Sequence, residues 1–231
     1  MRVSTRGWMA LAAVVLAAAG SSCQSIAYGP IGGSAGTGQT YKLDENGYIR
    51  NWLVLAPIYF GSAYNAEEIE QDQIPGEANM TPAAGDKQKV RTVIPDVDLD
   101  TFTEKTLTWE PVATKDFALD FNEWLGLDGS QGAGGYAVTY LVAPDDMREL
   151  KLGIGSNDDG KIFLNGKRVW GLVAARSLEE DSDIVEHVTL KKGVNVLIFK
   201  VWNDANNWQG CVRLMDKDGN AVRNVEVRLS R

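Results

Sequence analysis

The chain has 231 residues, of which 44% are hydrophobic and 23% are charged, a composition typical of globular proteins rather than disordered or collagen-like ones. Acidic residues outnumber basic residues by 31 to 23, and a net charge of -8 repels a phosphate backbone and so excludes a general nucleic-acid binder. One histidine and two cysteines exclude most zinc sites and disulfide scaffolds.

The N-terminus has the layout of an export signal. Arg2 and Arg6 supply positive charge ahead of an apolar stretch at residues 8–19. This stretch is too short to cross a hydrocarbon core, which needs about 20 residues. We therefore predict that residues 1–22 are a signal peptide that is cleaved.

Two cleavage sites compete at the end of this signal. Ala17 and Ala19 form an Ala-x-Ala site for ordinary signal peptidase, whereas Ser21-Ser22-Cys23 offers the small residues before cysteine that a lipoprotein site requires. Gly20 departs from the lipoprotein pattern, which usually carries an aliphatic residue at this position. A Gly/Ser-rich tether at residues 29–38 suits an anchored domain, so we favour lipidation of Cys23 and keep a lone cysteine in a disordered tail as the alternative.

Processing makes the protein more acidic. Residues 1–22 carry two arginines and no acid, so the mature chain has 21 basic and 31 acidic residues and a net charge of -10. We expect a flexible tether at 23–48, a folded domain at 49–231, and export to the cell envelope as a membrane-anchored lipoprotein, or otherwise to the periplasm or the outside. A Cys23–Cys211 bridge has no geometric support, and Cys211 is expected to be a small, half-buried strand residue.

Short extended runs follow one another through the rest of the chain. They cover residues 49–58, 90–94, 107–111, 117–121, 136–143, 149–156, 161–164, 184–190, 194–202, 211–215 and 225–229. The last run alternates apolar and polar residues, which indicates one buried face, whereas 194–202 is apolar on both sides, which is typical of a central strand.

Turn residues separate these runs. They are Asp158-Asp159-Gly160, Asn165-Gly166, Lys192-Gly193 and Asp218-Gly219-Asn220. Many short strands joined by tight turns predict an all-β fold, a two-sheet antiparallel β-sandwich of the jelly-roll type. The acidic, weakly patterned stretch at 64–86 is predicted to be one long surface loop.

Four segments resemble a known group of modules. They are WLVLAP at 52–57 with Trp109, YAVTYL at 136–141, LGIGSNDDGKIFLNGK at 152–167 and KKGVNVLIFKV at 191–201. Together they resemble exported bacterial jelly-roll modules of the galactose-binding-like and protective-antigen-like type, whose known members often bind carbohydrate. The resemblance covers 49–231 and implies the fold more strongly than the function, because Asn-Gly and Lys-Gly-x-Asn elements also serve tight hairpins.

The resemblance also implies a metal. In protective-antigen-like lectins a similar adjacent Asp pair holds calcium, which coordinates sugar hydroxyls, so Asp158 and Asp159 are candidate calcium ligands. Position 157 is Asn where the group often has Asp, and further oxygen ligands would have to come from another loop. Candidates for these are Asn203, Asp204, Asn206 and Asn207. The alternative is that both aspartates cap a turn before Gly160.

The segment 202–208 is the second candidate feature. We predict that it forms a loop at one end of the sandwich, where indole faces stack on sugar rings and amides bind hydroxyls. The ligand-binding candidates are Trp208, Asn203, Asp204, Asn206, Asn207 and, elsewhere, Trp170. Trp202 ends an apolar strand, so the core is the alternative for it. The tryptophans expected in the core are Trp52, Trp109 and Trp124.

Catalytic motifs are missing from the sequence. It has no Gly-x-Ser-x-Gly elbow, paired histidines or phosphate loop, and His187 is expected on the solvent side of its strand. The acids cluster in turns, with no pair whose proton affinities would be driven apart. We therefore expect a non-catalytic exported carbohydrate-binding or cell-surface recognition module. The alternative is a structural or assembly domain of a surface protein complex with no glycan ligand.

Overall fold

A computed structural model describes residues 39–61, 69–95 and 98–231. The predicted signal peptide, Cys23 and the tether at 29–38 lie outside these residues. None of the helices within the described ranges has the length and apolar character needed to cross a bilayer.

The larger sheet is built around two long, paired strands, β7 (Ser130–Ala143) and β12 (Gly193–Asn206). The strand order is β1-β14-β7-β12-β9-β10, with β2 also pairing β7 and β5 pairing β2. The other strands are β1 (Thr40–Lys42), β2 (Asn51–Tyr59), β5 (Glu110–Ala113), β9 (Asp159–Leu164), β10 (Lys167–Leu172) and β14 (Glu226–Arg228). Because β12 pairs with β7 on one side and β9 on the other, the prediction of a central strand is confirmed.

A second antiparallel sheet packs against the first. Its order is β11-β8-β13-β6, and its strands are β6 (Leu119–Asp120), β8 (Met147–Asn157), β11 (Asp183–Leu190) and β13 (Gln209–Met215). Phe199 of β12 lies so close to Gly210 of β13 that a Cβ at this glycine would be 2.5 Å from the Phe199 ring. The two sheets therefore share one core, and the predicted all-β sandwich is confirmed.

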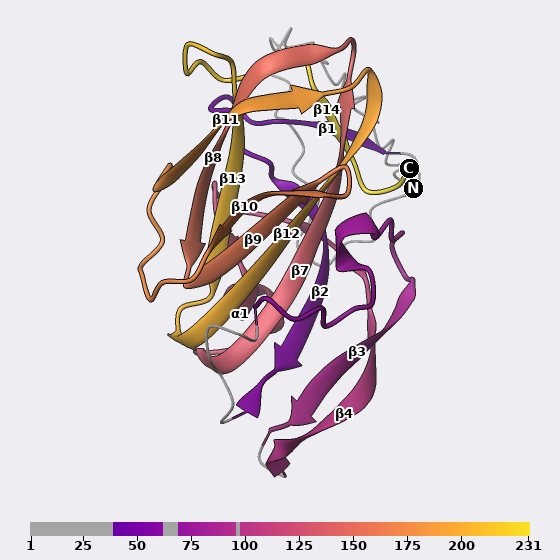
Figure 1. Cartoon of the computed structure of the whole chain (residues 1–231), viewed down its shortest axis with the longest axis vertical. Coiled ribbons are helices and arrows are strands. Elements are labelled where there is room, and N and C mark those ends of the chain that lie inside the picture. The colour runs from indigo at the N-terminus through magenta and orange to yellow at the C-terminus, as the bar shows by residue number, and fades with distance from the viewer. Residues whose placement is uncertain (1–38, 62–68, 96–97) are drawn as a thin grey trace, which may run out of the picture.

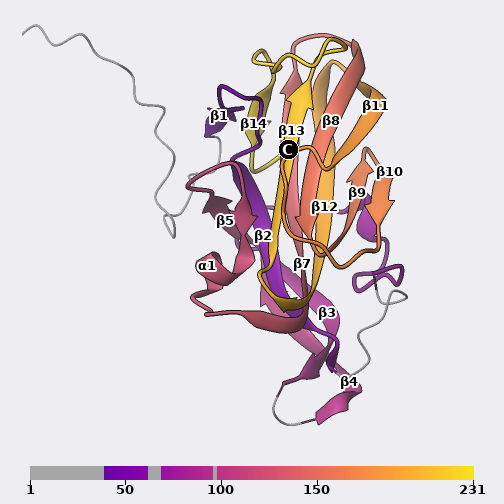
Figure 2. The same ribbon diagram turned by 90° about the vertical axis from the view of Figure 1, so that its left-hand side faces the viewer.

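A two-stranded ribbon projects beyond the sandwich. It consists of β3 (Lys87–Ile94) and β4 (Asp98–Thr108), which extend past the end of β2 in both views (Figures 1 and 2). The sequence predicted residues 90–94 of β3 as extended, but of β4 it predicted only the end, in the run at 107–111. The residues before this run are rich in Thr, Asp, Glu and Lys, so the strand lacks the apolar pattern that a core-forming strand carries.

Two further boundaries differ from the prediction. The sandwich begins before residue 49, because β1 pairs with β14 and Tyr41 and Leu43 are buried. The run at 117–121 forms only the short β6 and then a helical turn, α1 (Phe121–Leu125), because the Asp120 side chain caps the Glu123 amide.

The described part of the predicted surface loop is attached to the sheet through several buried residues. Residues 69–86, which include the 3-10 turn η2 (Glu77–Asn79), run across the outer face of the larger sheet, and Ile69, Ile74 and Glu77 are all buried. The segment has no strand and about half of its residues are exposed, so the prediction of a surface loop holds for the described residues. The buried contacts that attach the loop to the sheet were not predicted, because many of them are polar.

A buried ion pair attaches this segment to the sheet. Lys200 of β12 is 0% exposed and Glu77 is 1% exposed, and the Lys200 ammonium lies 2.8 Å from the Glu77 carboxylate. The Tyr136 hydroxyl donates to the same carboxylate at 2.5 Å, and Lys200 also donates to the Gln71 carbonyl at 2.7 Å. Burial lowers the pKa of Lys200 to about 8, with Glu77 opposing the shift.

A second lysine strengthens the attachment. Lys161 of β9 lies directly opposite Lys200 in the strand register, is also buried, and contacts Glu70 at 3.1 Å. Arg168 of β10 contacts the same Glu70 carboxylate at 2.8 Å. Basic side chains on the three neighbouring strands β12, β9 and β10 thus fix the position of the acidic segment on the sheet.

Removing the Lys200 ammonium should be costly. In Lys200→Ala the Glu77 carboxylate loses its buried counter-charge, so we expect the free energy of unfolding in urea to fall by about 3–5 kcal/mol. The matched double variant, Lys200→Met with Glu77→Leu, removes both charges and should recover most of that loss. A loss below about 1 kcal/mol in Lys200→Ala would show that the pair does not hold the segment.

Candidate functional site

Antiparallel pairing brings the predicted site residues to one end of the sandwich. Asp159 lies opposite Trp202, Asn157 opposite Gln209, and Asn206 opposite Ser130. The β8–β9 junction, the β12–β13 turn and the start of β7 therefore meet at this end, which we call the β12–β13 end (Figure 1).

The carboxylates of Asp158 and Asp159 are buried and bind main-chain amides from other segments. Asp158 accepts from the Asp204 N–H at 2.9 Å and from the Arg176 N–H at 3.1 Å. Asp159 accepts from the Ala174 N–H at 2.8 Å. The two side chains thus organise the β12–β13 end and the β10–β11 connection, a longer-range role than capping a turn before Gly160.

The indole of Trp208 lies in the core and offers no face to a ligand. It is 0% exposed, stacks on Phe121 of α1 with 4.4 Å between ring centroids, and donates to the Val201 carbonyl at 3.3 Å. A stacking platform at Trp208 is therefore ruled out. The physical reason is that β12 continues to Asn206, so the predicted loop shrinks to a tight turn and Trp208 falls on the inner side.

The other candidate and core tryptophans are also buried or half-buried. Trp202 is fully buried and stacks on Phe60, as the core alternative for it required. Trp170 is half-buried at the open edge of the sandwich, where its ring packs over Gly160 and near Phe199. Trp52 and Trp109 are buried and Trp124 is half-buried.

The polar candidates of this end divide into buried and exposed groups. Asp204, Asn206 and Asn207 are exposed. Asn203 is 0% exposed, and its amide nitrogen donates to the Ser130 carbonyl and hydroxyl at 2.9 and 3.0 Å. The Asn203 Oδ1 and the Oδ1 of buried Asn157 have no hydrogen-bond partner among the described residues.

Arg176 is a residue that the sequence analysis missed. Its guanidinium donates to the Ser156 carbonyl at 3.1 Å and hydroxyl at 2.8 Å, and pairs with Asp183 at 2.7 Å. It thereby fixes the main chain that presents its own N–H to Asp158. No pattern within 173–182 marks this arginine, because its partners come from other strands.

The donor set at this end suits a hard cation better than a soft one. No group of three or more His, Cys, Asp or Glu residues capable of holding a metal occurs within the described ranges. A cation here would combine the Asp158 carboxylate with amide oxygens such as Asn157 Oδ1 and Asn203 Oδ1. Calcium accepts such mixed carboxylate and neutral oxygen sets.

His187 lies away from this end and is solvent-exposed, as predicted. It occupies a bulge in β11 with a φ of 59° and is 77% exposed. Its Nδ1 lies 2.7 Å from the Glu149 carboxylate.

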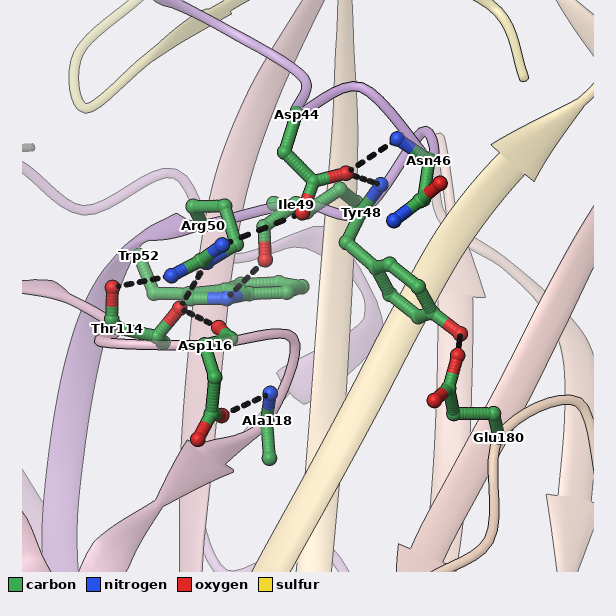
Figure 3. Close-up of polar contacts among 10 residues, drawn as sticks. All are labelled: Asp44, Asn46, Tyr48, Ile49, Arg50, Trp52, Thr114, Asp116, Ala118 and Glu180. Carbon is green, nitrogen blue, oxygen red and sulfur yellow. Dashed lines mark hydrogen bonds and ion pairs between the residues drawn. The ribbon is translucent and has the colours of Figure 1, made fainter. Parts of the chain in front are cut away.

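A second buried polar cluster precedes β2 (Figure 3). Asp44 accepts from the Tyr48 N–H at 2.8 Å and pairs with Arg50 at 3.2 Å. Arg50 in turn donates to the hydroxyl and the carbonyl of Thr114 at 2.7 and 2.9 Å, and the Tyr48 hydroxyl donates to Glu180 at 2.6 Å. These contacts join β2 to the β5–β6 and β10–β11 connections, so the cluster serves the fold.

The sequence matches no protein-family model and no curated protein. A solved structure to which the chain is similar is described as the crystal structure of the PA14 domain of the antifreeze protein MpAFP. The two are 12% identical with a TM-score of 0.36, and the alignment covers 86% of this chain and 92% of that chain. The β-sandwich assignment rests on the two sheets themselves.

Losing the Asp158 carboxylate should loosen the β12–β13 end. In Asp158→Ala the Arg176 and Asp204 amides lose a charged acceptor, so we expect their hydrogen exchange to accelerate about tenfold or more while the β7–β12 amides stay protected. Asp145→Ala is the control, because the Asp145 side chain is 80% exposed and pairs with Lys192 across the surface. Unchanged exchange at Arg176 would contradict the organising role.

Proposed function

We propose that this chain is a non-catalytic binding module that takes carbohydrate at the β12–β13 end. The observation that carries the proposal is that two buried amide oxygens, Asn157 Oδ1 and Asn203 Oδ1, have no hydrogen-bond partner among the described residues and belong to the same end of the sandwich as the buried Asp158 carboxylate. A buried acceptor without a partner costs about 1–3 kcal/mol, so such oxygens are explained when a bound group satisfies them.

Calcium is the group that fits these oxygens. Two main-chain N–H groups orient the Asp158 carboxylate, and each of its oxygens keeps a further lone pair for a cation. Asp159 follows Asp158 in the chain and is the second acidic candidate for a calcium ligand. Sugar hydroxyls would complete the coordination of the bound cation, as they do in the lectins that the sequence resembles.

The absence of an exposed indole from residues 202–208 decides how a glycan would be held. With Trp202 and Trp208 in the core, affinity at this end has to come from the cation and from polar side chains. Asp204, Asn206 and Asn207 are exposed there and supply donors and acceptors for hydroxyls. We therefore propose a calcium-dependent site in place of a tryptophan platform.

Glycan arrays and pull-downs on insoluble polysaccharides, run with calcium and with a chelator, test the proposal. We expect binding in calcium that is lost with chelator and in Asp158→Asn, and kept in the control Asp145→Asn. Calcium alone should raise the melting temperature of the wild type but not of Asp158→Asn. Binding that survives both chelator and Asp158→Asn would remove the metal from the site.

A structural or assembly domain with no glycan ligand is the second candidate. Burial of both tryptophans of 202–208 favours it, because the remaining polar surface also suits a protein partner at the cell surface. The absence of binding on every glycan, with and without calcium, would select this alternative.

We also propose that the chain is exported and that a lipid on Cys23 anchors it to the membrane. The support is the signal layout and the small residues before Cys23. A globomycin-type inhibitor of lipoprotein signal peptidase should make the precursor accumulate, and Cys23→Ser should abolish that response. Normal processing in the presence of the inhibitor would instead assign cleavage to the Ala-x-Ala site.

A further inference from the structure

A depression of about 470 Å³ lies on the outer face of the larger sheet, near the start of β12. Val194 and Val196 form its floor, and Val194 is 41% exposed although it is apolar. The walls are residues 78–81, the Asn165–Gly166 turn and Arg231. This is the part of the sheet that the segment at 69–80 leaves uncovered.

One wall is held by a buried asparagine. Asn195 is 0% exposed. Its Oδ1 accepts from the side-chain amide of Asn165 at 2.9 Å and from the main-chain N–H of Lys191 at 2.8 Å. The Asn165 Oδ1 accepts from the Val196 N–H at 2.9 Å, which ties the hairpin turn to the floor strand. The Asn-Gly and Lys-Gly-x-Asn elements of the sequence thus build a rigid rim.

The opposite wall, residues 78–81, is held in place by contacts with the sheet below it. The Tyr140 hydroxyl donates to the Pro82 carbonyl at 2.6 Å, and the Lys200–Glu77 pair fixes the turn that leads into residues 78–81. A side chain at Gly166 would collide with the Asn79 amide, so the glycine lets the two walls approach each other. Both walls are therefore in place before any ligand arrives.

The rim carries three polar side chains that face solvent. The side chains of Asn79, Thr81 and Arg231 are exposed and make no hydrogen bond or ion pair with any described residue. No acidic side chain of the described chain lines the depression, although the protein as a whole carries a net charge of -8. A guanidinium, an amide and a hydroxyl thus surround an apolar floor.

We propose that this depression is a second ligand site, which takes one uronic-acid residue of an acidic polysaccharide. The Arg231 guanidinium matches a single carboxylate in charge and in its planar donor geometry. Asn79 and Thr81 can each donate and accept, as sugar hydroxyls do, and the valine floor packs against the C–H face of the ring.

The site is separate from the β12–β13 end. Val194 and Asp204 are ten residues apart on β12, which at ~3.3 Å per residue places them roughly 30 Å from each other. Calcium plays no part at the valine floor, so the two proposals can fail independently.

Methyl NMR of the full chain in the presence of chelator tests the proposal, with trigalacturonate as the probe and its methyl ester as the matched neutral ligand. We expect trigalacturonate to shift the methyl signals of Val194, Val196 and Met80. The methyl ester should bind about tenfold more weakly, and raised salt should erase much of the difference.

Variants then assign the contacts. Arg231→Ala should weaken trigalacturonate binding about tenfold and abolish the preference for acid over ester, and Asn79→Ala should weaken both ligands. Arg148→Ala, which removes an exposed arginine of β8 in the other sheet, is the control and should bind as the wild type does. Because Arg231, Asn79 and Arg148 are exposed, the melting temperatures should stay unchanged.

Three results would overturn the proposal. They are unmoved Val194 and Val196 methyl signals, equal affinity for acid and ester, and trigalacturonate binding that Arg231→Ala leaves intact. Shifts at Val194 that only a protein partner produces would identify the depression as a protein-docking surface instead.

Discussion

The Lys200–Glu77 pair determines what covers the outer face of the larger sheet. A charge that is 0–1% exposed is tolerated only when its counter-charge is present, so the segment carrying Glu77 has one position in which it can rest on β12. That position places the Tyr136 hydroxyl against the same carboxylate, while the Lys200 ammonium lies 4.6 Å from the centroid of the Trp202 ring. It also sets where the cover ends, at residues 78–82, and so leaves the valine floor of the depression open. One buried contact thus shapes both the core and the surface beside it.

Local pattern explains which parts of the fold could be predicted from the sequence. Both faces of β12 are apolar along 194–202, so its central position could be recognised, and the alternation of Val225, Val227 and Leu229 marks a strand with one buried face. The attachment of residues 69–86 to the sheet could not be predicted. Glu77 and Lys200 are 123 residues apart in the chain, and a lysine within an apolar run gives no indication of which acid it pairs with. An acidic stretch without that partner resembles a solvated loop.

The candidate site was only partly accessible to sequence reasoning. Asp158 and Asp159 stand out as an adjacent acidic pair, yet their amide partners at Ala174, Arg176 and Asp204 come from two other segments. Trp208 illustrates a different limit. Extending β12 by four residues beyond Trp202 moves the turn to Asn206 and carries the indole to the inner side, onto Phe121 of a helix that the sequence suggested was a strand.

Two buried asparagines on β12 differ in whether the fold satisfies their side-chain hydrogen bonds. Asn195 and Asn203 are both 0% exposed. The Asn195 amide is fully used, since its oxygen accepts two hydrogen bonds and its nitrogen donates to the carbonyls of Lys191 and Gly193. At Asn203 only the nitrogen is used, on Ser130, while the oxygen has no partner among the described residues. A valine-sized apolar residue would avoid that cost if packing were the only demand. The unpaired oxygen therefore supports the proposal of a bound group at the β12–β13 end, the end to which the Asp158 carboxylate also belongs.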